Sequence, residues 1–403
     1  MSEPQSRRRD TQYGPTSPLR SNDVRERNEK LVLRLIQDRG FISQSEVAQE
    51  TGLRPPTVFR IFSTLEEQEL ILPSPKRVAE SEGRGRRPSL YRVNSSAGYA
   101  IGVDLWAGSV AATVVDFSRT TVVNRLETFD SEGTVDSVLT QVTTLISELI
   151  SQAEIPHDRV LGIGIAAPGV VDITQGSVVS YERIAGMSGT GIVEALSEHF
   201  SLPVLVHNNS SVIALSEYRY GAVQGASSVL AVVIRTGVGG AFLQHGVPFT
   251  NGGITALEVG HLIVDPSGGT RKQPATLESI LNEDALFSRI SRVCDTQDRT
   301  EMLKCIEERF SSVIEALETP IEALSSAIVS LTNLFNPEEF LIVTRHAELS
   351  RFLASEAHER ASHFTTSTRL RPGPILAAEY DALLACRGAS DLVFDQFFTV
   401  SGN

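Results

Sequence analysis

The sequence predicts a winged helix-turn-helix followed by a duplicated α/β body in two lobes. The first 94 residues hold short helical patterns around a glycine turn, and the rest repeats one order of strands and helices. The third observation is that positive and negative charge are unevenly distributed along the chain. Residues 1–94 hold 17 Lys and Arg against 13 Asp and Glu, a balance of +4, so the rest carries −17 of the net charge of −13. A basic head on an acidic body favours a polyanion as the head's partner, although +4 over this length is mild.

Length and composition narrow the class of protein. A chain of 403 residues can form two or three domains, and it has no run of about eighteen apolar residues that would predict a membrane span. Arg7–Arg9 precede no apolar segment, so we expect no secretory signal and a cytoplasmic protein. The three cysteines lie far apart without a Cys-x-x-Cys pair, which predicts buried thiols, no disulfide framework and no metal. We also expect no cofactor and no membrane contact.

Residues 1–39 predict a tail and a first helix. Residues 1–20 are polar and contain Pro and Gly, which predicts a disordered tail. Asn22–Arg39 has an amphipathic helical pattern that ends at Gly40. The residues expected on its buried face are Leu31, Val32, Leu35 and Ile36.

Two short helices around a glycine turn follow. Ser43 and Glu46 have the spacing of a capping box, so a second helix begins there and runs to about Glu50. Thr51–Leu53 is a tight turn, and Pro55 suits the first turn of a third helix. The residues that this third helix buries, spaced i, i+3, i+4 and i+7, are Val58, Ile61, Phe62 and Leu65. Such a helix pair behind a longer helix is typical of a helix-turn-helix.

The third helix and the strands after it predict a surface for double-stranded DNA. Side chains off the apolar face would read bases in a major groove, where a Phe would touch a thymine methyl. The expected DNA contacts are Arg54, Thr57, Phe59, Arg60 and Ser63. Strands at Leu70–Leu72 and Ser89–Val93 would enclose a basic wing whose Arg84, Arg86 and Arg87 reach phosphates or a minor groove. We assign residues 21–94 to this domain; the alternatives are an ordinary helical bundle and a soluble Gly/Arg linker.

The body begins near Gly98 and has the same order of elements twice. The expected strands are Tyr99–Asp104, Val110–Asp116, Thr121–Thr128, Val160–Ala166, Val204–Val206 and Phe340–Val343, with a hairpin of Ser227–Ile234 and Val238–Gln244. The expected helices are Val135–Gln152, Gly191–Phe200 and Val212–Arg219, and the chain from Thr276 is mostly helical. Three strands, a helix, a strand and a helix in each half predict a duplicated fold with a cleft between two lobes.

The stretch Val204–Ser211 predicts a ligand site. Three apolar residues end in a polar cluster, so a buried strand opens at its carboxyl end onto a helix N-terminus, where open α/β sheets place ligands. The amides of Asn208 and Asn209 can both donate and accept, and so can hold hydroxyl groups. The cluster has no carboxylate, which a proton-transfer enzyme needs.

From about Arg20 to Gly388 the sequence resembles the ROK family, which groups sugar kinases with sugar-responsive transcriptional repressors. Its motifs are individually weak, and the resemblance rests on their order and spacing. They are Gly85–Pro88, Gly162–Asp172, Val206–Asn209, Thr236–Gly240, Glu258–His261, Leu277–Ser279 and Asn336-Pro337. The resemblance implies an actin/hexokinase-like (ribonuclease H-like) body over residues 98–403. The first motif resembles the wing of the repressor branch.

Departures from the family pattern imply that kinase chemistry has been lost. Asn209 stands where the kinases have a catalytic Asp, and an amide cannot accept a sugar hydroxyl's proton near pH 7. Trp106 would fill space that a phosphate needs, and Arg235 replaces a glycine of the phosphate loop. The family's Cys-rich zinc segment is replaced by Pro266–Pro274, so His261 alone would not hold zinc.

The resemblance implies a sugar pocket without catalytic residues. Its expected residues, carried over position by position, are Gly169, Asn208, Asn209, Glu258, His261 and Glu278. The alternative for Glu258 and His261 is a structural role in a relic site. Asp104 and Asp172 are expected to cap loops.

Three functions follow from these observations. The first is a repressor that binds a two-fold operator as a homodimer or homotetramer and senses a sugar. The second is an active sugar kinase with a DNA-binding head, and the third is a ligand-independent DNA-binding protein with a scaffold body. Detectable phosphorylation would favour the second, and no response to any sugar would favour the third. The apolar helices around Ile314–Leu334 either pack a dimer or form core.

Overall fold

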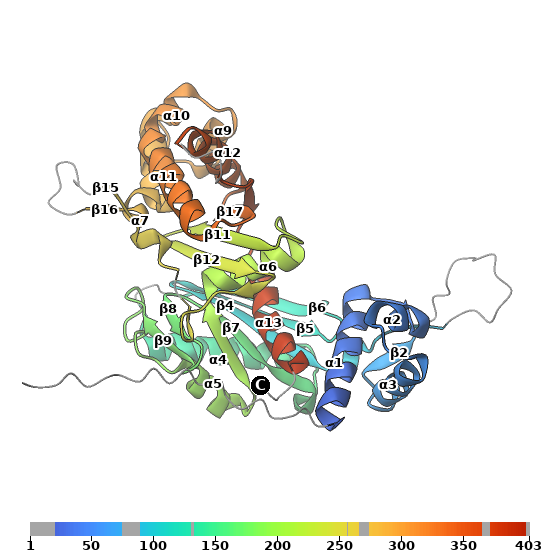
Figure 1. Ribbon diagram of the computed structural model, residues 1–403. Coiled ribbons are helices and arrows are strands. Elements are labelled where there is room, and N and C mark those ends of the chain that lie inside the picture. The colour runs from blue at the N-terminus through green and yellow to red at the C-terminus, as the bar shows by residue number, and fades with distance from the viewer. Residues whose placement is uncertain are drawn as a thin grey trace, which may run out of the picture. The chain divides into compact units, whose positions relative to one another are not determined.

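The computed structural model describes residues 21–74, 89–129, 133–255, 257–265, 274–364 and 371–399 (Figure 1). Contacts divide the described chain into two compact units. One unit holds the residues up to Asn94 together with Phe398 and Thr399, and the other holds Ser95–Phe397. The expected tail, residues 1–20, lies outside the described residues, as does the wing loop of residues 75–88.

The first unit is a winged helix-turn-helix. It contains α1 (Ser21–Arg39), α2 (Gln44–Thr51) and α3 (Pro55–Glu67). Its antiparallel sheet has the order β1–β3–β2, formed by Ile42–Ser43, Leu90–Val93 and Ile71–Pro73. Two of these strands flank the wing loop, as the sequence predicted. The expected fold of the head is therefore confirmed.

Local chemistry fixes the ends of α2 and the core of α3. The Glu46 backbone N–H donates to Ser43 Oγ at 3.3 Å, and the Ser43 N–H donates to Glu46 Oε2 at 2.8 Å, which completes the predicted capping box. Gly52 ends α2 with φ of 69°, a left-handed conformation that favours glycine. The four apolar residues predicted on the inner face of α3 are all buried: Val58, Ile61, Phe62 and Leu65.

The predicted inner face of α1 is partly wrong. Leu31 is 49% exposed, whereas Val32, Leu33 and Ile36 are buried. Leu35 is half-buried. Because residues 31–33 are all apolar, helical periodicity allows two neighbouring stripes, and packing against α3 and the sheet selects the one centred on Val32 and Ile36.

The first lobe of the body is a five-stranded sheet in the order β10–β7–β4–β5–β6. The strands β4 (Tyr99–Trp106), β7 (Val160–Ala167) and β10 (Val204–Asn208) are parallel, and β5 (Ser109–Asp116) and β6 (Thr121–Thr128) continue it antiparallel. The helices that share its main apolar core are α4 (Val135–Gln152) and α5 (Ile192–Phe200).

The second lobe repeats this sheet strand for strand. Its order is β13–β12–β11–β17–β18, with β11 (Ser228–Ile234), β17 (Glu339–Thr344) and β18 (Ile375–Glu379) parallel. The strands β12 (Val238–Gln244) and β13 (Val247–Pro248) are antiparallel, as β5 and β6 are in the first lobe. Two sheets with the same order and directions confirm the predicted duplication.

Helices of the second lobe gather on one side of its sheet (Figure 1). They are α7 (Leu277–Leu281), α8 (Glu283–Cys294), α9 (Arg299–Glu307), α10 (Ser311–Ala316), α11 (Glu318–Phe335) and α12 (Ala347–Phe364). The remaining short strands are β8 (Val170–Asp172), β9 (Ser177–Ser180), β14 (Ile254–Thr255), β15 (Ile263–Asp265) and β16 (Ala275–Thr276). No helix in the described ranges is long and apolar enough to cross a membrane.

Helix α13 (Ala382–Phe398) returns from the second lobe to the first-lobe sheet. It approaches the strands so closely that glycines are needed beneath it. A Cβ on Gly102 would lie 1.8 Å from the Cys386 carbonyl oxygen, and one on Gly164 would lie 1.9 Å from that of Ala389. These glycines are neighbours on β4 and β7, so together they form the floor on which α13 packs.

We predict that Gly164→Ala lowers the free energy of unfolding by about 1–3 kcal/mol, because the new methyl group forces α13 away from the sheet. Gly191→Ala is a matched control, since a Cβ there meets only the flexible Glu194 side chain, no closer than 3.3 Å. Denaturant titration of both variants measures the difference. Equal stability of the two variants would contradict the close packing.

Candidate functional site

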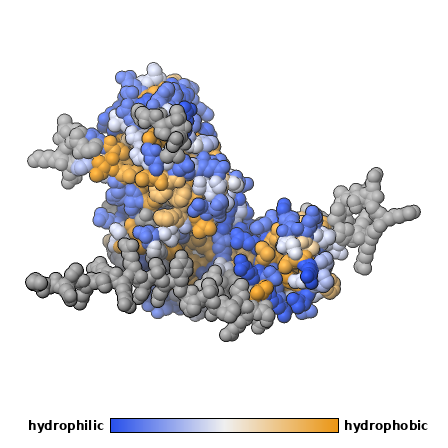
Figure 2. Space-filling model, in the orientation of Figure 1, coloured by the Kyte–Doolittle hydropathy of each residue, from blue (hydrophilic) through white to orange (hydrophobic). Residues whose placement is uncertain are grey.

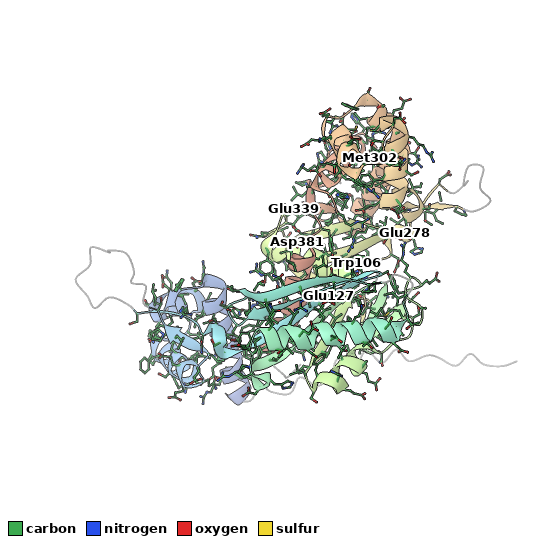
Figure 3. All side chains as sticks on the ribbon, turned by 180° about the vertical axis from the view of Figure 1, so that it is seen from behind. Trp106, Glu127, Glu278, Met302, Glu339 and Asp381 are labelled. Carbon is green, nitrogen blue, oxygen red and sulfur yellow. The ribbon has the colours of Figure 1, made fainter. Side chains whose placement is uncertain are left out.

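Four side chains meet where the two lobes join. Asp104 and Trp106 lie on β4, Arg235 follows β11, and Tyr380 follows β18. The Arg235 Cζ atom is 3.5 Å from the centre of the Trp106 ring and 4.0 Å from that of Tyr380. Figure 3 labels Trp106, Glu278 and Asp381 around this junction. The guanidinium group of Arg235, from the second lobe, therefore contacts aromatic rings from both lobes.

Asp104 holds the two aromatic residues of the cluster. Its Oδ2 atom accepts a hydrogen bond from Trp106 Nε1 at 2.9 Å and another from the Tyr380 hydroxyl. The side chain is 1% exposed, and burial raises its pKa to about 6, while Tyr380, Arg235 and Trp106 act in the opposite direction. The expectation that Asp104 caps a loop is wrong. Asp172 does cap a turn, because its Oδ1 accepts from the N–H groups of Thr174 and Gln175.

A further contact reaches the β11–β12 hairpin from the first lobe. Arg183, which lies between β9 and α5, donates from Nη2 to the Thr236 carbonyl oxygen at 2.8 Å. Nearby Tyr181 is largely buried, and burial raises the pKa of its hydroxyl. Sequence patterning did not identify Arg183, because it lies in a segment without helical or strand periodicity.

The strand end singled out from the sequence opens onto a helix N-terminus, as predicted. Asn208 caps α6 (Asn209–Tyr220), since its Oδ1 accepts from the Ser210 N–H at 2.9 Å. Its Nδ2 donates to the Gly169 carbonyl oxygen at 2.6 Å, which brings two predicted sugar-binding residues together. Gly169 has φ of +79°, and a Cβ there would lie 2.2 Å from the Ser180 carbonyl oxygen. Only glycine fits this position.

Asn209 follows this strand end and has a buried amide donor without a partner among the described residues. It is 3% exposed, and its Nδ2 has no hydrogen-bond partner in the part of the chain that the structure describes. A buried donor left unpaired costs about 1–3 kcal/mol, which a ligand oxygen would recover. The amide can therefore hold a hydroxyl group, but it has no basicity with which to deprotonate one.

The remaining predicted sugar residues form two further groups. Glu278 on α7 accepts the Val238 N–H at 2.9 Å through Oε2, so it lies against the hairpin. Glu258 and His261 flank a short 3-10 turn, with 3.5 Å between Oε2 and Nε2 and side chains that are 49% and 71% exposed. No hydrogen bond between described residues joins these groups to Asn208 or Asn209.

Metal ligands do not gather in the described ranges: no three His, Cys, Asp or Glu side chains are placed to hold an ion. Residues 266–273, which the resemblance aligns with the family's zinc segment, are outside the described residues.

The head presents a separate candidate surface on α3. Arg54, Phe59 and Arg60 are exposed, with Phe59 at 62%, while Thr57 and Ser63 are half-buried. An exposed Phe beside exposed arginines suits contact with base edges and phosphates. The predicted wing contacts Arg84, Arg86 and Arg87 lie outside the described residues.

Comparison with known proteins identifies the family. The ROK family model matches residues 100–396, and a winged helix-turn-helix DNA-binding model matches residues 25–71. The chain belongs to the ROK family. It is similar to the xylose repressor of Bacillus subtilis strain 168, with 25% identity over 93% of this chain and 96% of that one. It is also similar to the DNA-binding transcriptional dual regulator NagC of Escherichia coli strain K12, with 26% identity over 82% and 83%.

Solved ROK structures share this fold. A ROK family transcriptional regulator, described as a homologue of the Escherichia coli MLC protein, matches with a TM-score of 0.75 and 19% identity over 93% of this chain and 98% of its own. A ROK family glucokinase from Streptomyces griseus, solved with glucose and AMPPNP, matches with a TM-score of 0.62 and 20% identity over 74% of this chain and 100% of its own. The predicted family and its transcriptional-regulator branch are confirmed.

The buried Asp104 predicts an unusual pH dependence of stability. Because its folded-state pKa, about 6, exceeds the ordinary value of 3.8, its contribution is present at low pH and is lost as pH rises through 6. Relative to Asp104→Asn, the unfolding free energy of the natural chain should fall by about 1.4 kcal/mol per pH unit between pH 4 and 6. Denaturant titration across this range measures it.

His207→Gln is the companion variant. Burial lowers the pKa of His207 to about 4, so its contribution has the opposite sign and is lost as pH falls from 6.5 toward 4. A difference between the natural chain and Asp104→Asn that does not change with pH would contradict the burial of the carboxyl group.

Proposed function

We propose that this ROK protein is a transcriptional repressor that binds operator DNA through its head and senses a sugar in its body. The proposal rests on Asn209, a buried amide with an unpaired donor. The family resemblance places this residue where the kinases have a catalytic Asp. Such a residue supports binding of a polyhydroxyl ligand without its phosphorylation. The two named relatives, a xylose repressor and a DNA-binding transcriptional dual regulator, are both regulators of transcription, which agrees with a protein that is not an enzyme.

The DNA contacts are proposed for residues 21–94. In this assignment α3 enters the major groove, where Phe59 and Arg60 contact base edges and Arg54 approaches phosphate. Thr57 and Ser63 support the same face, and the wing arginines contact the backbone or the minor groove. A DNA partner places the proposed function in the cytoplasm.

The sugar site is proposed for the body, residues 98–403. Asn209 would donate to a sugar hydroxyl, beside Asn208 and Gly169, whose own bond fixes the strand end. Glu258, His261 and Glu278 would complete the site from the second lobe. Because these residues come from both lobes, a sugar bound more tightly in one lobe arrangement would shift the population toward it.

A homodimer or homotetramer is proposed because a two-fold repressor matches a two-fold operator. Buried residues of α11, among them Ile321, Leu324 and Ile328, favour core rather than interface for the helices around Ile314–Leu334. Leu334, Val247 and Phe249 remain 74%, 66% and 54% exposed. Figure 2 shows hydrophobic residues gathered over the middle of the body, and such surface on a protein supports association.

We predict that Arg60→Ala weakens operator binding by roughly ten- to a hundredfold, because it removes a contact to a base edge. The measurement is fluorescence anisotropy of a duplex that the intact protein selects from a random library. Arg25→Ala is the matched control, since Arg25 is exposed but paired with Glu29 on α1, at 2.8 Å. The control should retain affinity within about threefold.

An unchanged affinity for Arg60→Ala, and for Arg86→Ala combined with Arg87→Ala, would overturn the assignment of the head. The kinase alternative predicts ATP turnover with a hexose, and the scaffold alternative predicts no response to any sugar.

A further inference from the structure

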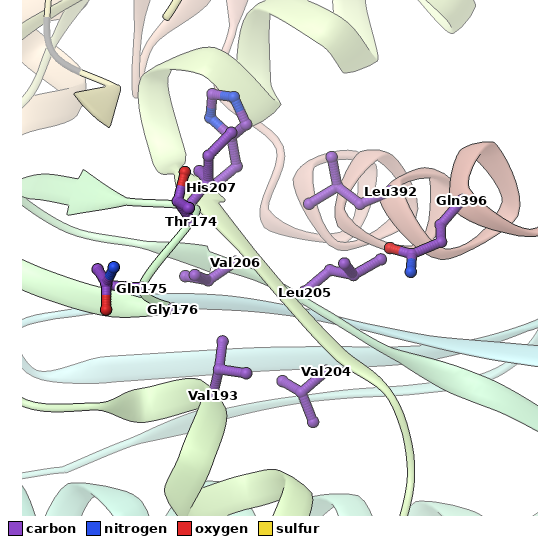
Figure 4. Close-up of a pocket in the computed structure, with 11 residues that line it drawn as sticks. Thr174, Gln175, Gly176, Val193, Val204, Leu205, Val206, His207, Leu392 and Gln396 are labelled. Atoms are coloured by element: carbon purple, nitrogen blue, oxygen red, sulfur yellow. The ribbon is translucent and has the colours of Figure 1, made fainter. Parts of the chain in front are cut away.

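A groove runs along the free edge of β10, outside the junction of the lobes. It encloses about 380 Å³, within the range of roughly 300–1,000 Å³ that ligand sites occupy. On one side it is bounded by α13, through Leu392 and Gln396, and on the other by the β8–β9 turn and α5, through Thr174–Gly176 and Val193 (Figure 4). The floor is the strand itself, from Val204 to His207.

The backbone on this edge has hydrogen-bonding groups without partners. Among the described strands, β10 is the last of its sheet, and its one partner is β7. Ile163 N–H donates to the Pro203 carbonyl, so alternation in a parallel pair turns residues 205 and 207 toward β7 as well. Val204 and Val206 therefore direct their N–H and C=O groups into the groove. No hydrogen bond to these groups is found in the described part of the chain.

Among the described residues, no charged side chain lines the groove. Its polar groups are the hydroxyl of Thr174, the amides of Gln175 and Gln396, and the imidazole of His207. His207 is 6% exposed and its Nδ1 has no partner in the described ranges. Burial lowers the pKa of His207 to about 4, so the ring is neutral near pH 7. An occupant that lies here would meet both hydrogen-bond donors and acceptors, and the described lining offers no charged partner.

We propose that this groove binds an extended, uncharged peptide segment of a partner protein as an added strand on β10. An extended backbone offers alternating N–H and C=O groups at the spacing that Val204 and Val206 require. Successive side chains of the peptide point to opposite faces, one toward Leu392 and the next toward Val193, so aliphatic residues suit both. Acidic or basic side chains of a segment would find no partner of opposite charge among the described lining residues, which favours uncharged segments.

The added strand would act on the proposed sugar sensor. β10 continues directly into Asn208 and Asn209, so a partner that pairs with this edge would restrain the strand end on which those amides are carried. The groove thus provides an input from a protein, separate from the sugar and from DNA. The proposal that a peptide binds in this groove does not depend on sugar or DNA binding, because it rests on the unpaired backbone groups of β10 and on the residues that line the groove.

The test uses a phage library of heptapeptides with uncharged central positions, selected on the intact protein. Enriched peptides, synthesised with acetyl and amide ends, are titrated by fluorescence anisotropy against two variants. Val206→Pro removes the outward N–H and leaves the pairing with β7, since proline is tolerated on the open side of an edge strand. Val206→Ala keeps the N–H and loses side-chain volume, so it is the matched control.

We expect Val206→Pro to weaken peptide binding about tenfold and Val206→Ala to change it by less than about threefold, because only the former loses the hydrogen bond. A second readout guards against misfolding of the proline variant: N-methylation of the peptide should abolish binding at alternate residues only. Failure to enrich any peptide, equal affinity of the two variants, or equal tolerance of N-methyl groups at every residue would overturn the proposal. Self-association through this edge in place of peptide binding would overturn it as well.

Discussion

The contact of Arg235 with Trp106 and Tyr380 holds the two lobes of the body together at their junction. It joins three segments that are far apart in sequence, and Asp104 beneath it orients both rings through hydrogen bonds. Cation–π contacts of this kind contribute about 0.5–2 kcal/mol each. The cluster therefore helps fix how the second-lobe hairpin meets the first-lobe sheet, and Arg183 reinforces that junction through the Thr236 carbonyl.

The same contact explains why a sugar-kinase fold can serve as a sensor. Glycines in a phosphate loop let backbone N–H groups approach an anion. The family resemblance places the large side chains of Trp106 and Arg235 where the kinases have such a loop. By the same resemblance Asn209 stands in place of the kinases' base, and its unpaired Nδ2 can still donate a hydrogen bond to a hydroxyl group. Two lobes remain useful in a body that does not catalyse a reaction. A ligand that contacts both sides of the junction favours one arrangement of the lobes over another.

Most of the fold could be predicted from local patterns in the sequence. Pro55, Gly52 and the Ser43–Glu46 box predicted α2 and α3, since those ends depend on backbone chemistry within a few residues. The stripe on α1 was misplaced because consecutive apolar residues left its phase open. The packing of α13 on Gly102 and Gly164, the stacking of Arg235, and the role of Asp104 could not be predicted, because each depends on segments that only the folded chain brings together. The sugar residues remain a prediction from resemblance, of which the structure joins Asn208 to Gly169.

The most direct measurement is a calorimetric titration of the intact protein with a panel of hexoses and hexose derivatives, each with and without Mg-ATP, followed by assay of the same samples for ADP. We expect saturable heat with at least one sugar, no added heat from Mg-ATP and no ADP. Binding of Mg-ATP, or formation of a sugar phosphate, would contradict the claim that the Arg235 cluster and Asn209 have converted a kinase site into a binding site. The absence of heat with every sugar would contradict the retained sugar pocket.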